Sequence, residues 1–217
     1  MSLDLGELGH GADVTEAAQD RGWHDDRVPF EDTTDARVWY VAYGSNLLGA
    51  RLQIYLDNSG DPTPPADRCA MVLPHRLFFA DWTKRWSGGC AFIDPTVDSE
   101  ANTLVTAWSL TEPQFLSVLS QENGRRTSDA DLDLASLDLA SLGPGERTLV
   151  GDSRYAVVLG CPSPDARPAV TFTTPSLPLP SPTRPSALYV DTIVAGLVEG
   201  HGIDDDEARA YVAARIL

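Results

Sequence analysis

The residues Val38-Trp39-Tyr40-Val41-Ala42 lead directly into Tyr43-Gly44-Ser45-Asn46, and the fold is decided at this junction. The first five residues are a continuous apolar run, which predicts a strand over residues 38–43. A strand that stops at Gly-Ser-Asn leaves main-chain N–H groups without ladder partners, and residues 49–56 are compatible with a following helix. We therefore expect a turn at residues 43–46 that binds an anionic or carbonyl group.

The composition limits the class of protein. A chain of 217 residues can bury one large core, so we expect one domain with appendages. It has 32 acidic and 16 basic residues, and the resulting formal charge of -16 repels nucleic-acid phosphates and anionic lipid surfaces. No apolar run approaches the roughly 20 residues of a membrane span. We therefore expect a small-molecule partner, with no nucleic acid and no membrane.

The cysteines and histidines indicate neither disulfides nor a metal site. Cys69, Cys90 and Cys161 are widely spaced and form no C-x-x-C pair, which is typical of a protein in a reducing compartment. The four histidines show no H-x-x-x-H spacing, and no dinucleotide or phosphate-loop motif is present. We therefore expect a cytoplasmic protein that uses no metal and no other cofactor.

Charge and turn residues divide the chain into segments. Residues 1–36 are acidic and poor in aliphatic residues, which predicts a solvated N-terminal extension with a short helix near residues 14–21. The folded domain is predicted for residues 37–217. Residues 128–146 contain Leu-Asp-Leu-Ala-Ser twice, a period that fits neither strand nor helix. We interpret them as an acidic surface insertion, either a lid or a loop without catalytic meaning.

The rest of the pattern predicts strands followed by helices. Thr111 is placed to cap a helix, Pro113 suits its first turn, and Glu122 lies at its far end. A proline-rich connector over residues 175–185 precedes two further helices, predicted over residues 186–199 and 204–216. The remaining strands, paired antiparallel at first, are predicted at residues 69–73, 76–82, 89–93, 104–110, 153–159 and 169–174.

Four motifs, in this order, resemble the γ-glutamylcyclotransferase family. Its members typically show Tyr-Gly-Ser-Asn-Leu after a first strand, and residues 43–47 reproduce that turn. Residues 86–91, Trp-Ser-Gly-Gly-Cys-Ala, are similar to the family's aromatic and Gly-Gly strand. Glu122 follows Trp108 at the family's interval between a strand and the catalytic glutamate. The start of the family's late helix is similar to a segment containing Pro185, Ser186, Tyr189, Ile193 and Gly196.

The resemblance covers residues 37–200 and implies both a fold and an activity. The fold is α+β, a small mixed β-barrel flanked by helices, with its cavity at the barrel mouth. The activity is release of 5-oxoproline from a γ-glutamyl amine or peptide, with Glu122 as general base and then general acid. The turn amides would hold a carboxylate or oxyanion. Substrate binding is assigned to Tyr40, Tyr43, Gly44, Ser45, Asn46 and Tyr189.

Several of these residues also have simpler interpretations. Tyr40 and Tyr189 are equally well explained as core aromatic residues. Ser45 lacks a G-x-S-x-G elbow and is interpreted as part of the turn, not as a nucleophile. Gly88 and Gly89 are expected to allow close approach of two chains, and Cys90 to be a small buried residue.

Two departures from the family pattern leave the substrate and the activity open. Asn123 stands where the family usually has glycine, and residues 125–127, Arg-Arg-Thr, replace a segment that often contains an aromatic residue. Either Arg125 or Arg126 binds an acidic or larger amine substituent, or the parent activity is lost. The alternative function is therefore a catalytically inactive binding or scaffolding module on the same fold. The sequence does not indicate an oligomeric state.

Overall fold

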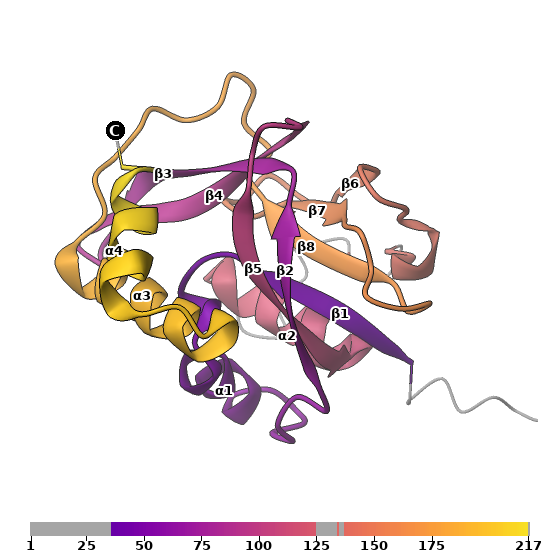
Figure 1. The fold of residues 1–217 in the computed structure, drawn as a ribbon. Helices are drawn as coiled ribbons and strands as arrows, with labels where there is room; N and C mark the ends of the chain where they lie inside the picture. The colour runs from indigo at the N-terminus through magenta and orange to yellow at the C-terminus, as the bar shows by residue number, and fades with distance from the viewer. Residues whose placement is uncertain (1–35, 125–133, 135–136, 217) are drawn as a thin grey trace, which may run out of the picture. The chain divides into compact units, whose positions relative to one another are not determined.

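The computed structural model describes residues 36–124, 134 and 137–216. Strands and helices both contribute to its core (Figure 1), which confirms the predicted α+β class. The strands are β1 (Arg37–Ala42), β2 (Arg68–Leu73), β3 (His75–Thr83), β4 (Gly88–Val97), β5 (Thr103–Thr111), β6 (Arg147–Leu149), β7 (Val157–Gly160) and β8 (Ala169–Thr173). The helical segments are η2 (Ser45–Leu47), α1 (Gly49–Asp57), α2 (Glu112–Glu122), η3 (Leu139–Ser141), α3 (Ala187–His201) and α4 (Asp205–Ala213).

The strands lie in a mixed six-stranded sheet and a separate hairpin. The sheet has the order β2-β5-β1-β8-β7-β6, and β3 pairs with β4. Strand β1 pairs antiparallel with β5 and parallel with β8. The two sheets share one interior, because Phe92 of the hairpin packs in the same cluster as Tyr40 of β1. The small mixed barrel implied by the resemblance thus consists of two sheets around common apolar clusters.

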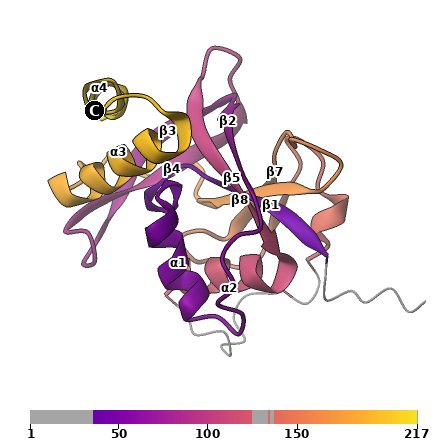
Figure 2. The same ribbon diagram turned by 60° about the horizontal axis from the view of Figure 1, so that its bottom comes forward.

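Strand β1 is covered on both faces. Successive side chains of a strand point to opposite sides of the sheet. Val38 and Tyr40 pack with residues of α1 and α2, whereas Trp39 and Val41 pack with residues of α3 and α4. Figure 2 shows α1 beside α2, and α3 together with α4 in another part of the molecule. A strand buried on both faces requires a continuous apolar run, which explains the sequence of residues 38–42.

The predicted element boundaries differ from the structure mainly near β6 and β7. Strand β6 has no counterpart in the prediction, since its three residues are too few to show a period. Strand β7 begins at Val157 and not at residue 153. The preceding residues form a compact turn in which the Val150 N–H donates to the Ala156 carbonyl over 2.7 Å.

The proline-rich connector runs along the β3–β4 hairpin. The Thr183 N–H donates to the Phe79 carbonyl, and the Gly89 N–H donates to the Arg184 carbonyl, both over 2.9 Å. A Cβ on Gly89 would overlap the main-chain carbonyl of Thr183. Glycine is therefore required for this close approach, as expected, and the contact fixes the chain just before α3.

Part of the segment interpreted as a surface insertion is buried. Leu137, Leu139 and Leu142 are all less than a tenth exposed and belong to the apolar cluster that contains α1 and α2 residues. The buried leucines are interspersed with exposed residues, Asp138, Ala140 and Ser141, so this part of the segment lies at the surface while a 3₁₀ turn anchors it to the core. Residues 1–35, 125–133, 135 and 136 lie outside the described residues, so the N-terminal extension, the lid, and Arg125 and Arg126 stay predictions.

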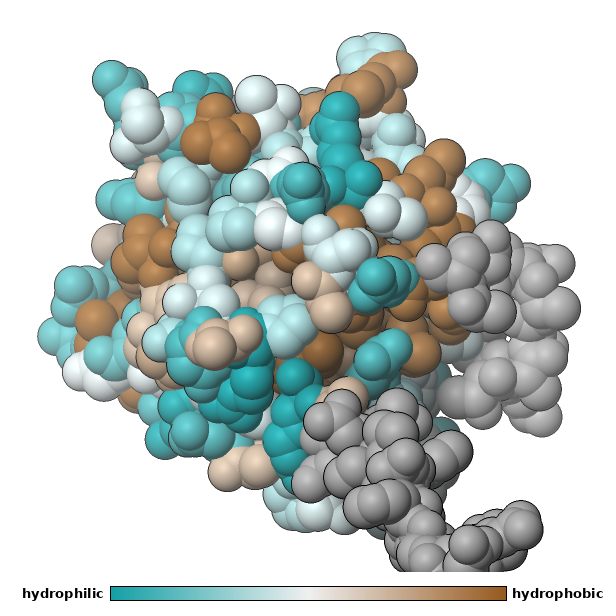
Figure 3. Space-filling model, turned by 90° about the vertical axis from the view of Figure 1, so that its right-hand side faces the viewer, coloured by the Kyte–Doolittle hydropathy of each residue, from teal (hydrophilic) through white to brown (hydrophobic). Residues whose placement is uncertain are grey.

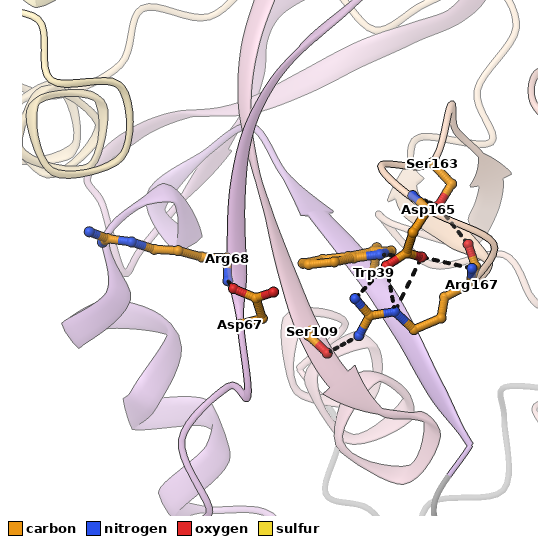
Figure 4. Close-up of polar contacts among 7 residues, drawn as sticks. All are labelled: Trp39, Asp67, Arg68, Ser109, Ser163, Asp165 and Arg167. Carbon is orange, nitrogen blue, oxygen red and sulfur yellow. Dashed lines mark hydrogen bonds and ion pairs between the residues drawn. The ribbon is translucent and has the colours of Figure 1, made fainter.

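A polar cluster holds the loop between β7 and β8 against the sheet (Figure 4). Trp39 Nε1 donates to Asp165 Oδ1 over 3.0 Å, and the Arg167 guanidinium lies 4.2 Å from the centre of the Trp39 ring. Arg167 also donates to Ser109 Oγ over 2.7 Å and to Asp165 Oδ2 over 2.6 Å. Hydrogen bonds from Arg167 hold the pKa of Asp165 well below its usual range. The cluster thereby connects the loop to β1 and β5.

The surface of the described residues is mixed in polarity. On the face shown in Figure 3, hydrophobic residues lie among hydrophilic ones. Such mixing is usual, because apolar atoms contribute more than half of the accessible surface of folded proteins. Within the described ranges, no helix combines the length and the apolar character needed to cross a membrane.

The contact between α3 and the turn after β1 can be tested at Gly196. A Cβ there would lie 2.6 Å from main-chain atoms of Leu47 and Leu48. Helix propensity alone favours alanine by about 1 kcal/mol, whereas overpacking against a backbone costs about 1–3 kcal/mol. We expect Gly196→Ala to lower the free energy of unfolding in urea. Gly60→Ala is the control, since nothing lies within 4 Å of its Cβ; a more stable Gly196→Ala protein would contradict this packing.

The polar cluster at Asp165 predicts a pH-dependent contribution to stability. A carboxyl whose pKa is lowered by folding stabilises the protein above its ordinary pKa of 3.8 and loses that effect as the pH falls further. We expect Asp165→Asn to melt a few degrees below the wild type at neutral pH, with the difference shrinking below pH 3.8. Asp205→Asn, which removes an exposed pair within one helix, should have a smaller effect. A difference independent of pH would contradict the role of the Asp165 charge.

Candidate active site

All residues assigned to the site from the sequence line one cavity at the end of β1. The strand ends at Ala42, η2 follows, and the far end of α2 faces the same space. The fold thus brings together residues as far apart in the sequence as Tyr40 and Tyr189, which are separated by 149 positions. They are Tyr40, Tyr43, Gly44, Ser45, Asn46, Glu122 and Tyr189.

The turn itself is held rigidly by main-chain and side-chain contacts. The Leu47 N–H donates to the Gly44 carbonyl over 3.0 Å, which makes the turn a short 3₁₀ helix. Trp108 Nε1 donates to the main-chain carbonyl of Asn46 over 2.9 Å. In the described part of the chain, the N–H groups of Gly44 and Asn46 make no hydrogen bond. These two amides therefore remain available to a ligand, and anion binding by the turn stays a prediction.

The side chain of Asn46 joins the turn to Glu122. Its Nδ2 donates to Glu122 Oε1 over 2.9 Å and to the Tyr40 hydroxyl over 3.1 Å. Asn46 is 3% exposed, and its Oδ1 is buried without a hydrogen-bond partner among the described residues. Buried polar atoms nearly always have a partner, so Oδ1 is a place where a ligand donor would be stabilised. The Glu122 carboxylate is thus connected to the turn by a single side chain, that of Asn46.

Helix α2 is anchored at both ends, which fixes the direction of Glu122. Thr111 caps its start, as the sequence predicts, and it forms a reciprocal capping box with Gln114. At its end, Gln121 Nε2 donates to the Tyr55 carbonyl of α1 over 2.9 Å. Asn123 accepts from the Tyr155 N–H over 2.8 Å and donates to the Tyr155 carbonyl over 3.2 Å. Asn123, which departs from the family pattern, therefore attaches α2 to the segment before β7.

Tyr189 is placed to donate its proton into the cavity. Its hydroxyl accepts from the Ala91 N–H over 3.1 Å. A phenol oxygen has two acceptor positions and one proton, so the proton stays free for a ligand. Burial raises the pKa of Tyr189, which keeps the hydroxyl protonated. Its ring packs 4.6 Å from that of Trp86, centre to centre.

The other two site tyrosines differ in what their hydroxyls do. Burial, and then the charge of Glu122, raises the pKa of Tyr40, whose oxygen accepts from Asn46 and whose proton remains free. The Tyr43 hydroxyl instead donates to the Phe172 carbonyl over 2.6 Å. Tyr43 thus supports the wall of the cavity, whereas Tyr40 and Tyr189 have protons to donate.

The sequence did not identify several further residues of the cavity. Tyr155 donates to the Ala91 carbonyl over 3.1 Å and packs its ring against Phe92 and Phe172. It comes from an irregular segment, so no period marks it. Cys90 lines the cavity as a free, buried thiol whose pKa is raised by burial, in agreement with its interpretation as a small buried residue. Among the described side chains, no group of three or more His, Cys, Asp and Glu residues is arranged to hold a metal ion.

The hydrogen bond of the Tyr189 hydroxyl predicts a stability effect. Tyr189→Phe leaves the buried Ala91 N–H without its acceptor, which costs about 1–3 kcal/mol. We expect a loss of this size in the free energy of unfolding, measured by urea denaturation. Leu188→Ala, at a residue 65% exposed on the same helix, should change it by no more than about 0.5 kcal/mol. Equal stability of Tyr189→Phe and the wild type would show that the hydroxyl does not hold this amide.

Comparison by sequence finds one relative and no family model. No family model matches the chain. The chain is 31% identical over 204 residues to histone deacetylase 5 of Arabidopsis thaliana, a match that covers 83% of this chain and 31% of that protein. The chain thus spans about a third of the length of this relative.

Comparison by structure identifies the fold. The chain is similar to a γ-glutamyl cyclotransferase with a TM-score of 0.51 and 17% identity, over 80% of this chain and 87% of the other. It is similar to an uncharacterized protein from Homo sapiens with a TM-score of 0.51 and 17% identity, over 81% and 88% of the two chains. The chain therefore has the γ-glutamyl cyclotransferase fold, as its four motifs imply.

Proposed function

We propose that the protein releases 5-oxoproline from a γ-glutamyl amine or peptide. The observation that carries this proposal is the hydrogen bond between Asn46 Nδ2 and Glu122 Oε1, which places a carboxylate beside the anion-binding turn. The fold shared with a γ-glutamyl cyclotransferase supports it. A site of this kind needs one proton acceptor and fixed donors for a developing negative charge.

The turn and the tyrosines would bind the γ-glutamyl group. The free N–H groups of Gly44 and Asn46 suit a carboxylate or an oxyanion. Asn46 Oδ1, buried and unpaired, suits a donor such as the substrate's α-amine. Tyr40 and Tyr189 offer protons that their own contacts leave free. Donors held in place before the reaction stabilise charge without reorganising as it develops.

Glu122 would move two protons, one after the other, from the α-nitrogen to the departing nitrogen. The carboxylate takes the first proton from the substrate's α-ammonium, and the amine nitrogen attacks the γ-carbonyl carbon. A carbon–nitrogen bond forms and closes the five-membered ring, and the carbonyl oxygen becomes an oxyanion that the turn and tyrosine donors stabilise. Glu122 gives this proton to the nitrogen of the original amide, and that amide bond breaks as the carbonyl re-forms. The ring nitrogen then loses its extra proton through Glu122 to the released amine, which leaves as an ammonium ion. Glu122 ends ionised, and the reaction consumes no water and transfers no electrons.

A second candidate is a binding or scaffolding module without turnover. The relative histone deacetylase 5 favours it, because the chain matches only 31% of that protein, whose name describes a different activity. Similar folds are known to host unrelated functions. In that case the cavity binds a ligand through the same amides and hydroxyls, and no 5-oxoproline is formed.

The role of Glu122 can be tested by Glu122→Gln. Glutamine can still accept a hydrogen bond from Asn46 Nδ2, but it cannot carry the proton. We expect 5-oxoproline release from a panel of γ-glutamyl amino acids, amines and peptides to fall by about 10²–10⁴-fold. Glu112→Gln, at the opposite end of the same helix, should retain activity.

Two outcomes would decide against the proposal. Full turnover by Glu122→Gln would show that this carboxylate does not move the proton. Absence of 5-oxoproline release by the wild type on the whole panel would favour the module without turnover.

A further inference from the structure

Arg51, on α1 next to the cavity, carries a buried positive charge. The residue is 8% exposed, and its Nη2 donates to the Tyr55 hydroxyl over 2.8 Å. The guanidinium carbon lies 4.5 Å from the centre of the Tyr55 ring and 5.7 Å from that of Trp86, which lines the cavity. Its Nε is buried without a hydrogen-bond partner among the described residues. A buried cation with an unpaired donor is costly unless an anion approaches it.

Arg85 approaches the same tyrosine from the turn between β3 and β4. It is exposed, and its Nη1 donates to the Tyr55 hydroxyl over 3.2 Å. The Glu122 carboxylate lies close enough to the Tyr55 hydroxyl for its charge to act on it. Burial, followed by the negative charge of Glu122, raises the pKa of Tyr55, so the hydroxyl keeps its proton while its oxygen accepts from both arginines. Two guanidinium groups therefore converge on one hydroxyl near the proposed acid/base.

Neither arginine is neutralised directly within the described ranges. The ion pairs recorded there use other arginines, namely Arg68, Arg76, Arg154, Arg167 and Arg209. Among the described residues, Glu122 forms no ion pair with Arg51 or Arg85. Two like charges beside one hydroxyl repel each other, and a carboxylate bound between them would remove that repulsion while accepting the planar N–H donors of arginine.

We propose that Arg51 and Arg85 bind a carboxylate on the departing part of the substrate and set the specificity for it. This inference rests on the proposed function. The departing nitrogen must contact Glu122 to receive its proton. In a γ-glutamyl amino acid, a single carbon separates that nitrogen from the α-carboxylate, so this carboxylate would need a cation close to Glu122. Arg51 and Arg85, beside Tyr55 and the cavity residue Trp86, are placed to supply it. The arginines are thus specificity residues, and neither takes part in proton transfer.

Two substrates that differ only in this carboxylate test the proposal. γ-Glutamyl-alanine carries it, and γ-glutamyl-ethylamide has a hydrogen atom in its place. We expect the wild type to favour γ-glutamyl-alanine by about tenfold or more in kcat/KM for 5-oxoproline release, the size typical of charge-assisted hydrogen bonds. In Arg85→Gln this preference should fall several-fold, mainly because KM for γ-glutamyl-alanine rises. Arg147→Gln, on the distant edge strand β6, should keep the wild-type preference.

Arg51 is tested by Arg51→Lys, which keeps the charge but loses the planar arrangement of donors. We expect an intermediate preference between the two substrates, and circular dichroism checks that the variant is folded. Should Arg51→Lys fail to fold, the exposed Arg85 alone still decides the outcome. An equal loss of kcat on both substrates in Arg85→Gln would mean that the arginine positions Tyr55 and Glu122, and would overturn carboxylate binding. Equal kcat/KM values of the wild type for the two substrates would also overturn carboxylate binding.

Failure of the proposed function is distinguishable from failure of this inference. If the wild type releases 5-oxoproline from both compounds equally well, the activity stands and the carboxylate site does not. If neither compound is turned over, both are titrated into the wild type by calorimetry. Tighter binding of γ-glutamyl-alanine that Arg85→Gln weakens would then support the site on a module without turnover. Equal binding, or no binding, would overturn it.

Discussion

The side chain of Asn46 connects the parts of the molecule on which the site depends. Its Nδ2 bridges the Tyr40 hydroxyl of β1 and the Glu122 carboxylate of α2, and its main-chain carbonyl accepts from Trp108 of β5. A carboxylate at the end of a helix ordinarily turns toward water, because ionised groups lose hydration when buried. Here the amide donor replaces part of that hydration and directs Glu122 to the turn. Two strands and one helix must be correctly placed for these three hydrogen bonds to form together.

Close packing supplies that placement, and glycine permits it. Helix α3 contacts the main chain of the turn at Gly196, and the connector before α3 contacts β4 at Gly89. These approaches bring Tyr189 to the amide of Ala91. The buried tyrosines then stay protonated, since burial raises their pKa. A site that offers neutral donors around one half-buried carboxylate suits proton transfer on a substrate that brings its own nucleophile.

Much of the fold was predictable where the signal is local. The apolar run of residues 38–42 and the Thr111 cap with Pro113 each express a requirement of their immediate backbone, and the structure shows both in the expected element. The contacts of Asn123 could not be predicted in this way. It differs from the family pattern beside Glu122, but its amide holds the main chain of Tyr155, 32 residues away. Burial of Leu137 and Leu139 likewise depends on helices elsewhere in the chain.

The α+β class, the order of the main elements and seven of the residues that line the cavity could be predicted from the sequence. Periodicity and capping are carried by neighbouring residues, and the resemblance to a family connected the distant motifs. Which atoms are in contact depends on the tertiary structure. The Asn46 side chain donates to Glu122, and the Tyr43 hydroxyl donates to the Phe172 carbonyl. Arg51 and Arg85 both donate to the Tyr55 hydroxyl. Such contacts join residues far apart in the chain, and their hydrogen bonds exist only once packing has fixed the distances between elements.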